Sequence, residues 1–252
     1  TLFRSIREVY MLYTNKCCFI AVMAFLSSIF ISNIASSSVI LKGNRIIYSA
    51  DAKDKVVEFS NNGDTPMLVQ VWLDKNNPDS TPDTADAPFI VTPQIFRINA
   101  LNGHALRLKF TGQTQQLPQD RESVFWFNYL QYPAIKSSDL AQNRLALIVK
   151  SRLKVFYRPP GLRGDASQAL TQLQVQRKGN MLTLQNPTPW HISLRNALLT
   201  RGEKSTAVGQ SVMIPPFGDT RWVLTDPVAT SVTVYAMNDY GTAVSHTFTL
   251  PR

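Results

Sequence analysis

The sequence predicts an all-β protein of two domains, and three observations lead to this fold class. Past residue 40, no segment has the spacing of a long amphipathic helix. Short runs rich in β-branched and aromatic residues recur instead, separated by turn residues. The triplet Pro159-Pro160-Gly161 divides these runs into two sets, because proline cannot continue a strand ladder and a proline pair forms a stiff linker.

The first set of runs predicts one sandwich. Breaks fall at Asn61-Asn62-Gly63-Asp64, in the polar loop 75–86 and at Asn102-Gly103. The predicted strands are residues 39–49, 55–61, 67–74, 89–98, 105–110, 123–130 and 145–157. About seven short strands with this spacing are typical of an immunoglobulin-like β-sandwich.

The second set predicts another sandwich, of about 90 residues. Its turns include Lys178-Gly179-Asn180 and Asn186-Pro187-Thr188-Pro189. The predicted strands are residues 173–177, 181–186, 192–199, 211–214, 220–224, 231–238 and 244–250. We therefore expect an N-terminal domain over residues 36–158, a linker over 159–161 and a C-terminal domain over 162–252.

Residues 1–35 are predicted to be a secretory signal peptide. The run 17–34 is almost wholly apolar or small, with Lys16 before it and Ala35 after it. Met11 is a plausible start, which would make residues 1–10 an upstream extension. The alternative is a transmembrane anchor, but a run of about 18 apolar residues is near the lower limit for crossing a bilayer.

Cysteine content and charge narrow the function classes. Cys17 and Cys18 both lie in the predicted signal, so the mature chain has no disulfide and must rely on packing. The whole chain carries a formal net charge of +9. Residues 1–35 hold three basic residues and one acidic residue, which leaves +7 for the mature chain. This balance favours an acidic partner, a membrane surface or nucleic acid, and export argues against nucleic acid.

The stretch 144–159, RLALIVKSRLKVFYRP, has the clearest pattern in the chain. Six of the seven odd positions from 145 to 157 are apolar, whereas the even positions include five basic residues. This alternation predicts a strand with one apolar and one basic face. At about 3.3 Å per residue it would extend roughly 40 Å, about twice a usual strand. Its first half is therefore available to a partner.

The sequence holds little that indicates catalysis or metal binding. His104, His191 and His246 have no carboxylate or cysteine at ligand spacing, so we expect surface or turn histidines and no metal site. The chain has no G-x-S-x-G or G-x-x-x-x-G-K-[ST] motif. The charge cluster 120–122 is interpreted as a solvated turn before a strand. These observations predict a binding protein with no catalytic residues and no cofactor.

Seven segments together resemble the periplasmic chaperones of the chaperone–usher pathway, which assemble pili and other surface fibres. The match follows the same order over essentially the whole mature chain. The segments are RIIYSA (45–50), VQVWLD (69–74), PFIVTPQIFRI (88–98), LPQDRESVFWFN (117–128), RLKVFYRP (152–159), NPTPW (186–190) and NDYG (238–241).

The resemblance implies a fold and a mechanism. The fold is two immunoglobulin-like domains set at an angle, with a cleft between them. The mechanism is donor-strand complementation, in which the chaperone lends a strand to a pilus subunit whose own sandwich lacks one. The residues lent here would be Leu145, Leu147 and Val149, whereas the apolar residues from 153 to 157 would pack in the first domain.

The resemblance also assigns two ionic sites. Arg45 and Lys154 match the cation pair that anchors the C-terminal carboxylate of a subunit. Glu122, Arg158 and Asp239 match an interdomain ion network that fixes the orientation of the domains. This chain departs from the usual pattern at Gln94, which follows the candidate cis bond Thr92-Pro93, and in lacking a disulfide in the second domain. The short segment 129–143 places it with the short-loop subfamily.

The resemblance predicts a periplasmic location, pilus subunits and an outer-membrane usher as partners, and no membrane anchor after signal cleavage. The competing hypotheses are a fibre subunit or adhesin of two sandwiches, and an exported hydrolase. A subunit should carry an alternating N-terminal extension and its own disulfide. The sequence does not identify the cognate subunits, and it leaves open whether the free protein covers its exposed strand by self-association.

Overall fold

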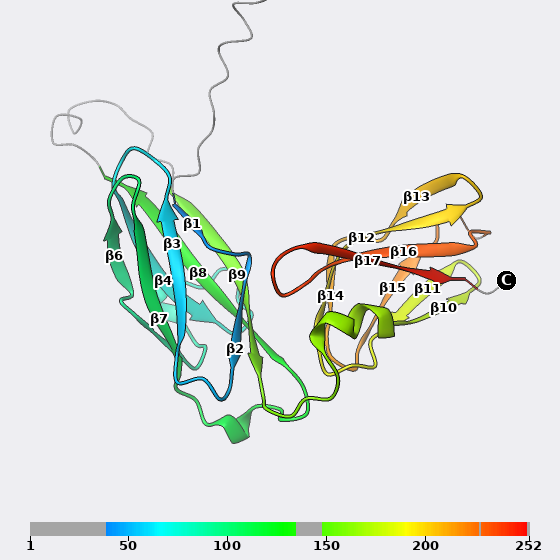
Figure 1. Cartoon of the computed structure of the whole chain (residues 1–252), viewed down its shortest axis with the longest axis horizontal. Coiled ribbons are helices and arrows are strands. Elements are labelled where there is room, and N and C mark those ends of the chain that lie inside the picture. The colour runs from blue at the N-terminus through cyan, green and yellow to red at the C-terminus, as the bar shows by residue number, and fades with distance from the viewer. Residues whose placement is uncertain (1–38, 135–147, 227, 251–252) are drawn as a thin grey trace, which may run out of the picture. The chain divides into compact units, whose positions relative to one another are not determined.

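The computed structural model describes residues 39–134, 148–226 and 228–250, which form two β-sandwiches (Figure 1). The two-sandwich all-β prediction is confirmed. The predicted signal segment lies outside the described residues, as do Leu145 and Leu147.

The first sandwich contains one four-stranded and one five-stranded sheet. The first sheet has the order β1-β3-β7-β5, with β1 Val39–Leu41, β3 Lys55–Asn61, β7 Gly103–Phe110 and β5 Phe89–Thr92. The second has the order β2-β9-β8-β4-β6, with β2 Arg45–Ser49, β9 Val149–Arg158, β8 Ser123–Pro133, β4 Met67–Asp74 and β6 Ile95–Ile98. Two 3-10 turns, η1 Pro82–Thr84 and η2 Thr114–Gln116, lie in the loops.

Two predicted strands of the first sandwich were wrong as single elements. Residues 39–49 form β1 and β2, which belong to opposite sheets, and the chain turns between them at Gly43, where φ is +101°. Residues 89–98 form β5 and β6, also in opposite sheets. Pro93 lies between them and has no N–H for a ladder. The Thr92-Pro93 bond is cis, as expected.

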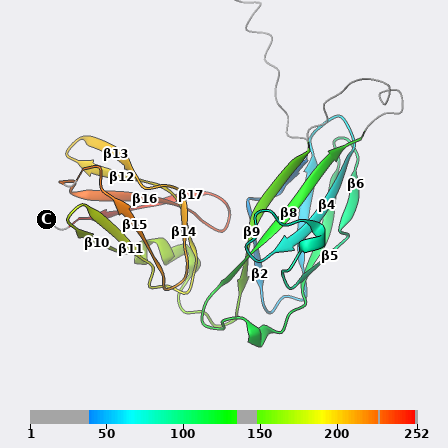
Figure 2. The same ribbon diagram turned by 180° about the vertical axis from the view of Figure 1, so that it is seen from behind.

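The core of the first sandwich explains why β9 alternates. Val155 and Tyr157 are buried in this core, and Leu153 packs against it, as predicted. Views from the front and from behind both show β9 beside β8 (Figures 1 and 2). The second half of β9 is therefore an integral core strand.

The second sandwich combines a three-stranded with a five-stranded sheet. The smaller sheet is β10-β11-β15, with β10 Gln174–Lys178, β11 Met181–Gln185 and β15 Asp219–Val223. The larger is β13-β12-β16-β17, with β14 also paired to β12. Its strands are β12 Ile192–Arg201, β13 Lys204–Val208, β14 Val212–Ile214, β16 Ser231–Met237 and β17 Ala243–Thr249.

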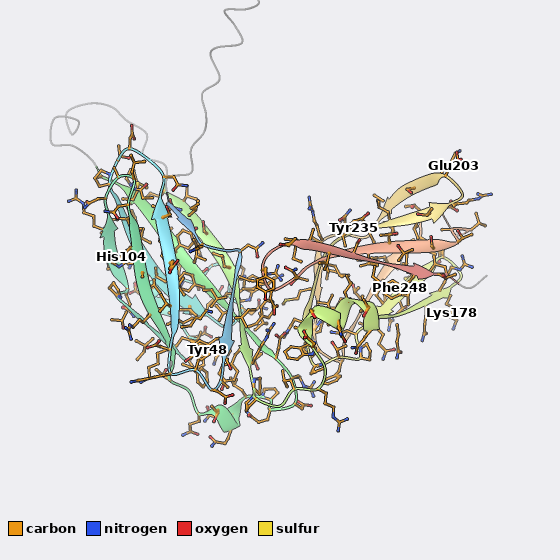
Figure 3. The ribbon with its side chains drawn as sticks, viewed as in Figure 1. Tyr48, His104, Lys178, Glu203, Tyr235 and Phe248 are labelled. Atoms are coloured by element: carbon orange, nitrogen blue, oxygen red, sulfur yellow. The ribbon has the colours of Figure 1, made fainter. Side chains whose placement is uncertain are left out.

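Two elements of the second sandwich were not predicted. Strand β13 is exposed at all positions but Val208, so it carries no alternating apolar signal. It forms a hairpin with β12 that has Glu203 at its tip, and Glu203 and Lys178 mark exposed ends of this sandwich (Figure 3). The 3-10 helix η4, Ala166–Gln172, begins where the Asp165 side chain accepts a hydrogen bond from the Ser167 backbone.

Candidate functional site

Arg45 and Lys154 lie directly opposite each other in the first sandwich. Strands β2 and β9 run parallel, and these two residues are register partners. Burial, followed by the nearby charge of Arg45, lowers the pKa of Lys154. Burial also lowers the pKa of Arg45, although Asp239 and Glu122 oppose this effect. The pair therefore concentrates positive charge in a partly desolvated position.

Neutral oxygen atoms hold both cations. Arg45 donates from Nε to Asn44 Oδ1 at 3.0 Å and from Nη1 to the Met237 carbonyl at 2.8 Å. Lys154 Nζ donates to Ser193 Oγ at 3.3 Å. A guanidinium has five N–H donors and an ammonium three. Among the described residues neither cation forms an ion pair with a carboxylate, so each retains charge and donors for an anion.

An unpaired strand edge leads to this cation pair. Strand β8 pairs with β9 from Val149 to Tyr157 on one side. On the other side, β2 pairs with β9 only from Lys154 to Arg158. Within the described ranges, the backbone from 149 to 153 therefore has no strand neighbour on the β2 side. Val149 is 43% exposed and Ile148 is 50% exposed. An unpaired edge of this kind can accept another strand.

The structure brings Glu122, Arg158 and Asp239 together. Arg158 Nε contacts Glu122 Oε1 at 2.6 Å, and Nη1 contacts Asp239 Oδ2 at 2.7 Å. A second bond joins Arg158 Nη2 to Asp239 Oδ1 at 2.8 Å. Burial opposes the charge of Arg158, but the bonds to Asp239 and Glu122 outweigh it and raise its pKa. One guanidinium thus links two carboxylates, of which Asp239 belongs to the second sandwich.

His191 adds hydrogen bonds to Glu122 of this network, a contact that the sequence did not predict. Glu122 Oε2 accepts bonds from the His191 backbone at 2.7 Å and contacts His191 Nδ1 at 3.2 Å. The Glu122 backbone donates to the Pro189 carbonyl at 3.0 Å. The expectation was a surface or turn histidine. His191 directly follows the 186–190 turn, but its side chain is only 6% exposed, so a surface position is wrong for it. The NPTPW segment was the available signal, because its turn receives Glu122.

The charged turn before β8 was only partly predicted. Asp120 is exposed and Arg121 is partly exposed, and the two pair with each other, in line with a solvated turn. Glu122 was wrongly included in that interpretation, because its side chain is only 2% exposed. Of the three adjacent charged residues, the first two therefore face solvent, and Glu122 forms an ion pair in the interior.

The basic face of β9 is more fixed than its sequence indicated. Arg152 Nη2 contacts Asp74 Oδ1 at 2.7 Å, and its guanidinium lies 3.9 Å from the centre of the Trp126 ring. Asp74 is fully buried. Lys150 Nζ donates to the carbonyls of Pro78 and Ser80, both at 2.8 Å. Spacing along one strand gave no sign of the hydrogen-bond partners Asp74, Pro78 and Ser80, which lie 70 to 78 residues earlier in the chain.

In the part of the chain that the structure describes, no helix is both long and apolar enough to cross a membrane. No group of three or more His, Cys, Asp or Glu side chains is arranged to hold a metal ion in those ranges either.

The fold and the site together define a class: a β protein of two sandwiches that are joined by a partly buried ionic contact. The family model "Pili and flagellar-assembly chaperone, PapD N-terminal domain" matches residues 38–163. The model "Pili assembly chaperone PapD, C-terminal domain" matches residues 168–248. The chain therefore belongs to the PapD family of pilus-assembly chaperones.

Individual relatives agree with this family. The chain is 36% identical over 242 residues to the probable fimbrial chaperone YadV of Escherichia coli K12, covering 92% of this chain and 95% of YadV. The crystal structure of YadV covers 84% of this chain and 100% of its own, with a TM-score of 0.70 and 37% identity. The SafB chaperone of Salmonella enterica, solved in complex with the SafA pilin, gives a TM-score of 0.69 at 27% identity and covers 84% of this chain and 96% of that chain.

Proposed function

We propose that the chain is a periplasmic chaperone that binds, folds and caps pilus subunits by donor-strand complementation and delivers them to an outer-membrane usher. Family membership supports this proposal. The observation that carries it is the open edge of β9, which ends at the Arg45–Lys154 pair.

The geometry sets the direction in which a guest strand would bind. A guest that pairs with residues 149–153 occupies the edge of β9 in line with β2. If its terminal carboxylate meets Arg45 and Lys154, its C-terminus lies at the Lys154 end. The guest strand then runs parallel to β9, as β2 does. Main-chain hydrogen bonds supply affinity in this mode, and the carboxylate contact fixes the register.

The donor residues Leu145, Leu147 and Val149 would fill the groove of the subunit. Val149 begins β9, and the two leucines continue its alternation in sequence. Burial of one large apolar side chain contributes about 1.5–3 kcal/mol, so three would contribute roughly 5–9 kcal/mol before association costs. A free energy of this size would hold a subunit tightly and still allow its later displacement.

The Glu122–Arg158–Asp239 network would hold the two sandwiches in one orientation. Buried ion pairs add little net stability compared with apolar packing, but breaking one is costly. Orientation matters because Ser193 and Met237 of the second sandwich contact the two anchor cations. The network would thereby act on the subunit site from a distance.

Location and partners complete the proposal. Residues 1–35 would direct export and be removed, which leaves the mature protein in the periplasm. The SafB chaperone was solved with a pilin, which supports pilus subunits as partners. An usher partner follows from the family resemblance.

A capture experiment tests the function. The tagged chain is produced in the periplasm of its own bacterium, purified, and the chains that co-purify are identified by mass spectrometry. We expect pilus subunits with the wild-type protein. We expect Lys154→Ala to reduce their recovery at least about tenfold, because bonds to charged groups contribute about 1.5–3 kcal/mol.

Lys109→Ala is the matched control, since Lys109 is an exposed lysine on another strand of the same sandwich. It should capture subunits at the wild-type level. Absence of pilus subunits from the wild-type capture would overturn the function. Normal recovery with a folded Lys154→Ala protein would overturn the anchor.

A further inference from the structure

The two anchor cations contact a pair of residues that are themselves cross-strand partners. Arg45 and Lys154 are partners between β2 and β9. Their contacts in the second sandwich, Met237 and Ser193, are partners between β16 and β12. A pair of neighbouring residues in the first sandwich therefore faces a pair of neighbouring residues in the second. Each cation has one hydrogen-bond acceptor from the second sandwich.

The two acceptors differ in kind. The acceptor for Arg45 is the main-chain carbonyl of Met237, whose position is set by strand pairing. The acceptor for Lys154 is the side-chain hydroxyl of Ser193, which a single substitution can remove. Ser193 is only 6% exposed, so its hydroxyl lies in a fixed, largely dry position. It is the residue through which this contact can be tested.

A lysine side chain has many rotamers, and ordering it on binding costs entropy. Lys154 lies 5.9 Å from the centre of the Trp126 ring, and burial and Arg45 both oppose its charge. Among the residues that the structure describes, Ser193 Oγ is the hydrogen-bond acceptor that holds its ammonium. That bond occupies one of three donors and leaves two for a carboxylate.

We propose that Ser193 is a positioning residue that orders Lys154 for a terminal carboxylate, so that the anchor is built from both sandwiches. This inference rests on the proposed function, because it concerns the same carboxylate site. The second sandwich is then part of the binding site as well as a domain held beside it. Ser193 acts through Lys154, and its effect should vanish when Lys154 is absent.

The test is a double-mutant cycle on subunit recovery. The probe is the subunit chain that co-purifies with the wild-type protein, measured per chaperone chain. Loss of one hydrogen bond of about 1 kcal/mol corresponds to roughly a fivefold change. We expect Ser193→Ala to lower recovery about fivefold, and Ser193→Thr, which keeps the hydroxyl, to restore it. In the Lys154→Ala background, Ser193→Ala should cause no further loss.

Controls separate positioning from stability. Ser245→Ala removes an exposed hydroxyl from β17 and should leave recovery unchanged. Thermal unfolding of Ser193→Ala should match the wild type. Full recovery with Ser193→Ala, beside a defective Lys154→Ala, would overturn this inference and leave the proposed function standing. An equal loss with and without Lys154 would also overturn it, whereas normal recovery with Lys154→Ala would overturn the anchor itself.

Discussion

The two halves of β9 use the same alternating sequence for different purposes. Residues 154–158 pair with β2 on one side and with β8 on the other, except that Arg158 pairs only with β2. Residues 149–153 pair with β8 alone in the described structure. Val155 and Tyr157 are buried in the core, whereas Val149 is exposed. The second half completes a domain, and the first half remains available to a partner.

The open half is nevertheless held firmly by its side chains. Arg152 binds the buried carboxylate of Asp74, and Lys150 binds two carbonyls of the loop that follows β4. One face of the strand is therefore fixed while its backbone edge stays free. A strand whose backbone edge is unpaired can therefore still be held in place by its side chains. A fixed strand loses less freedom when a guest binds.

Leu147→Asp should have the largest effect on function. Leu147 lies outside the described residues and belongs to the proposed donor segment. An unpaired carboxylate in the apolar groove of a subunit is strongly unfavourable, so we expect capture of subunits to be abolished. The stability of the free protein, measured by denaturant unfolding, should stay at the wild-type value. An unchanged complex would show that the first half of the strand is not donated.

Arg158→Met, in the second half of β9, should instead reduce stability. It leaves Glu122 buried without its partner, and breaking such a pair costs about 3 kcal/mol. Denaturant unfolding measures this loss, and subunit capture should fall as well if the network orients the domains. Lys42→Met is the control, because its pair with Glu58 is exposed and should change stability by less than about 0.5 kcal/mol. Wild-type stability in Arg158→Met would contradict this role of the network.

Asp74→Asn tests the smallest of the expected effects, a change in how the stability of the protein depends on acid. Burial opposes the charge of Asp74, but bonds from Arg152, Asn128 and Ser80 outweigh it and lower its pKa. A pKa lower in the folded state than in the unfolded state, where it is about 3.9, adds stability above that pH. This stability is lost as pH falls through the folded pKa. Wild-type stability should therefore decline more steeply below about pH 4 than that of Asp74→Asn. Parallel acid profiles would remove Asp74 from this role.

Local alternation made much of the fold predictable from sequence. Strands β3 and β4 match the predicted ranges 55–61 and 67–74. The switch of strands between sheets at Gly43 and Pro93 was not predicted, because periodicity does not record which sheet a strand joins, even though polar residues flank both breaks, at 42–45 and 92–94. Polar β13 was missed because strand pairing alone, without an apolar face, defines it.

The candidate site was less predictable than the fold. Arg45 and Lys154 could be named only through the resemblance, because one arginine or lysine in a strand is usually a surface residue. Their contacts with Met237 and Ser193 join segments that are 192 and 39 residues apart. The bond between His191 and Glu122 likewise joins residues 69 positions apart. No local period encodes such pairs, since they arise only when separate strands have folded together.

Strand β2 pairs with β9 only from Lys154 onward, and this limits how far a guest strand can extend along β9. Because β2 already occupies the edge of β9 from Lys154 to Arg158, a strand bound along residues 149–153 cannot slide further in that direction. Under the proposed function, strand β2 would therefore limit how far a guest strand extends, at the position of the two cations. This limit would depend on where the guest strand ends and not on its side chains, so one chaperone would align subunits of different sequence to a common end point.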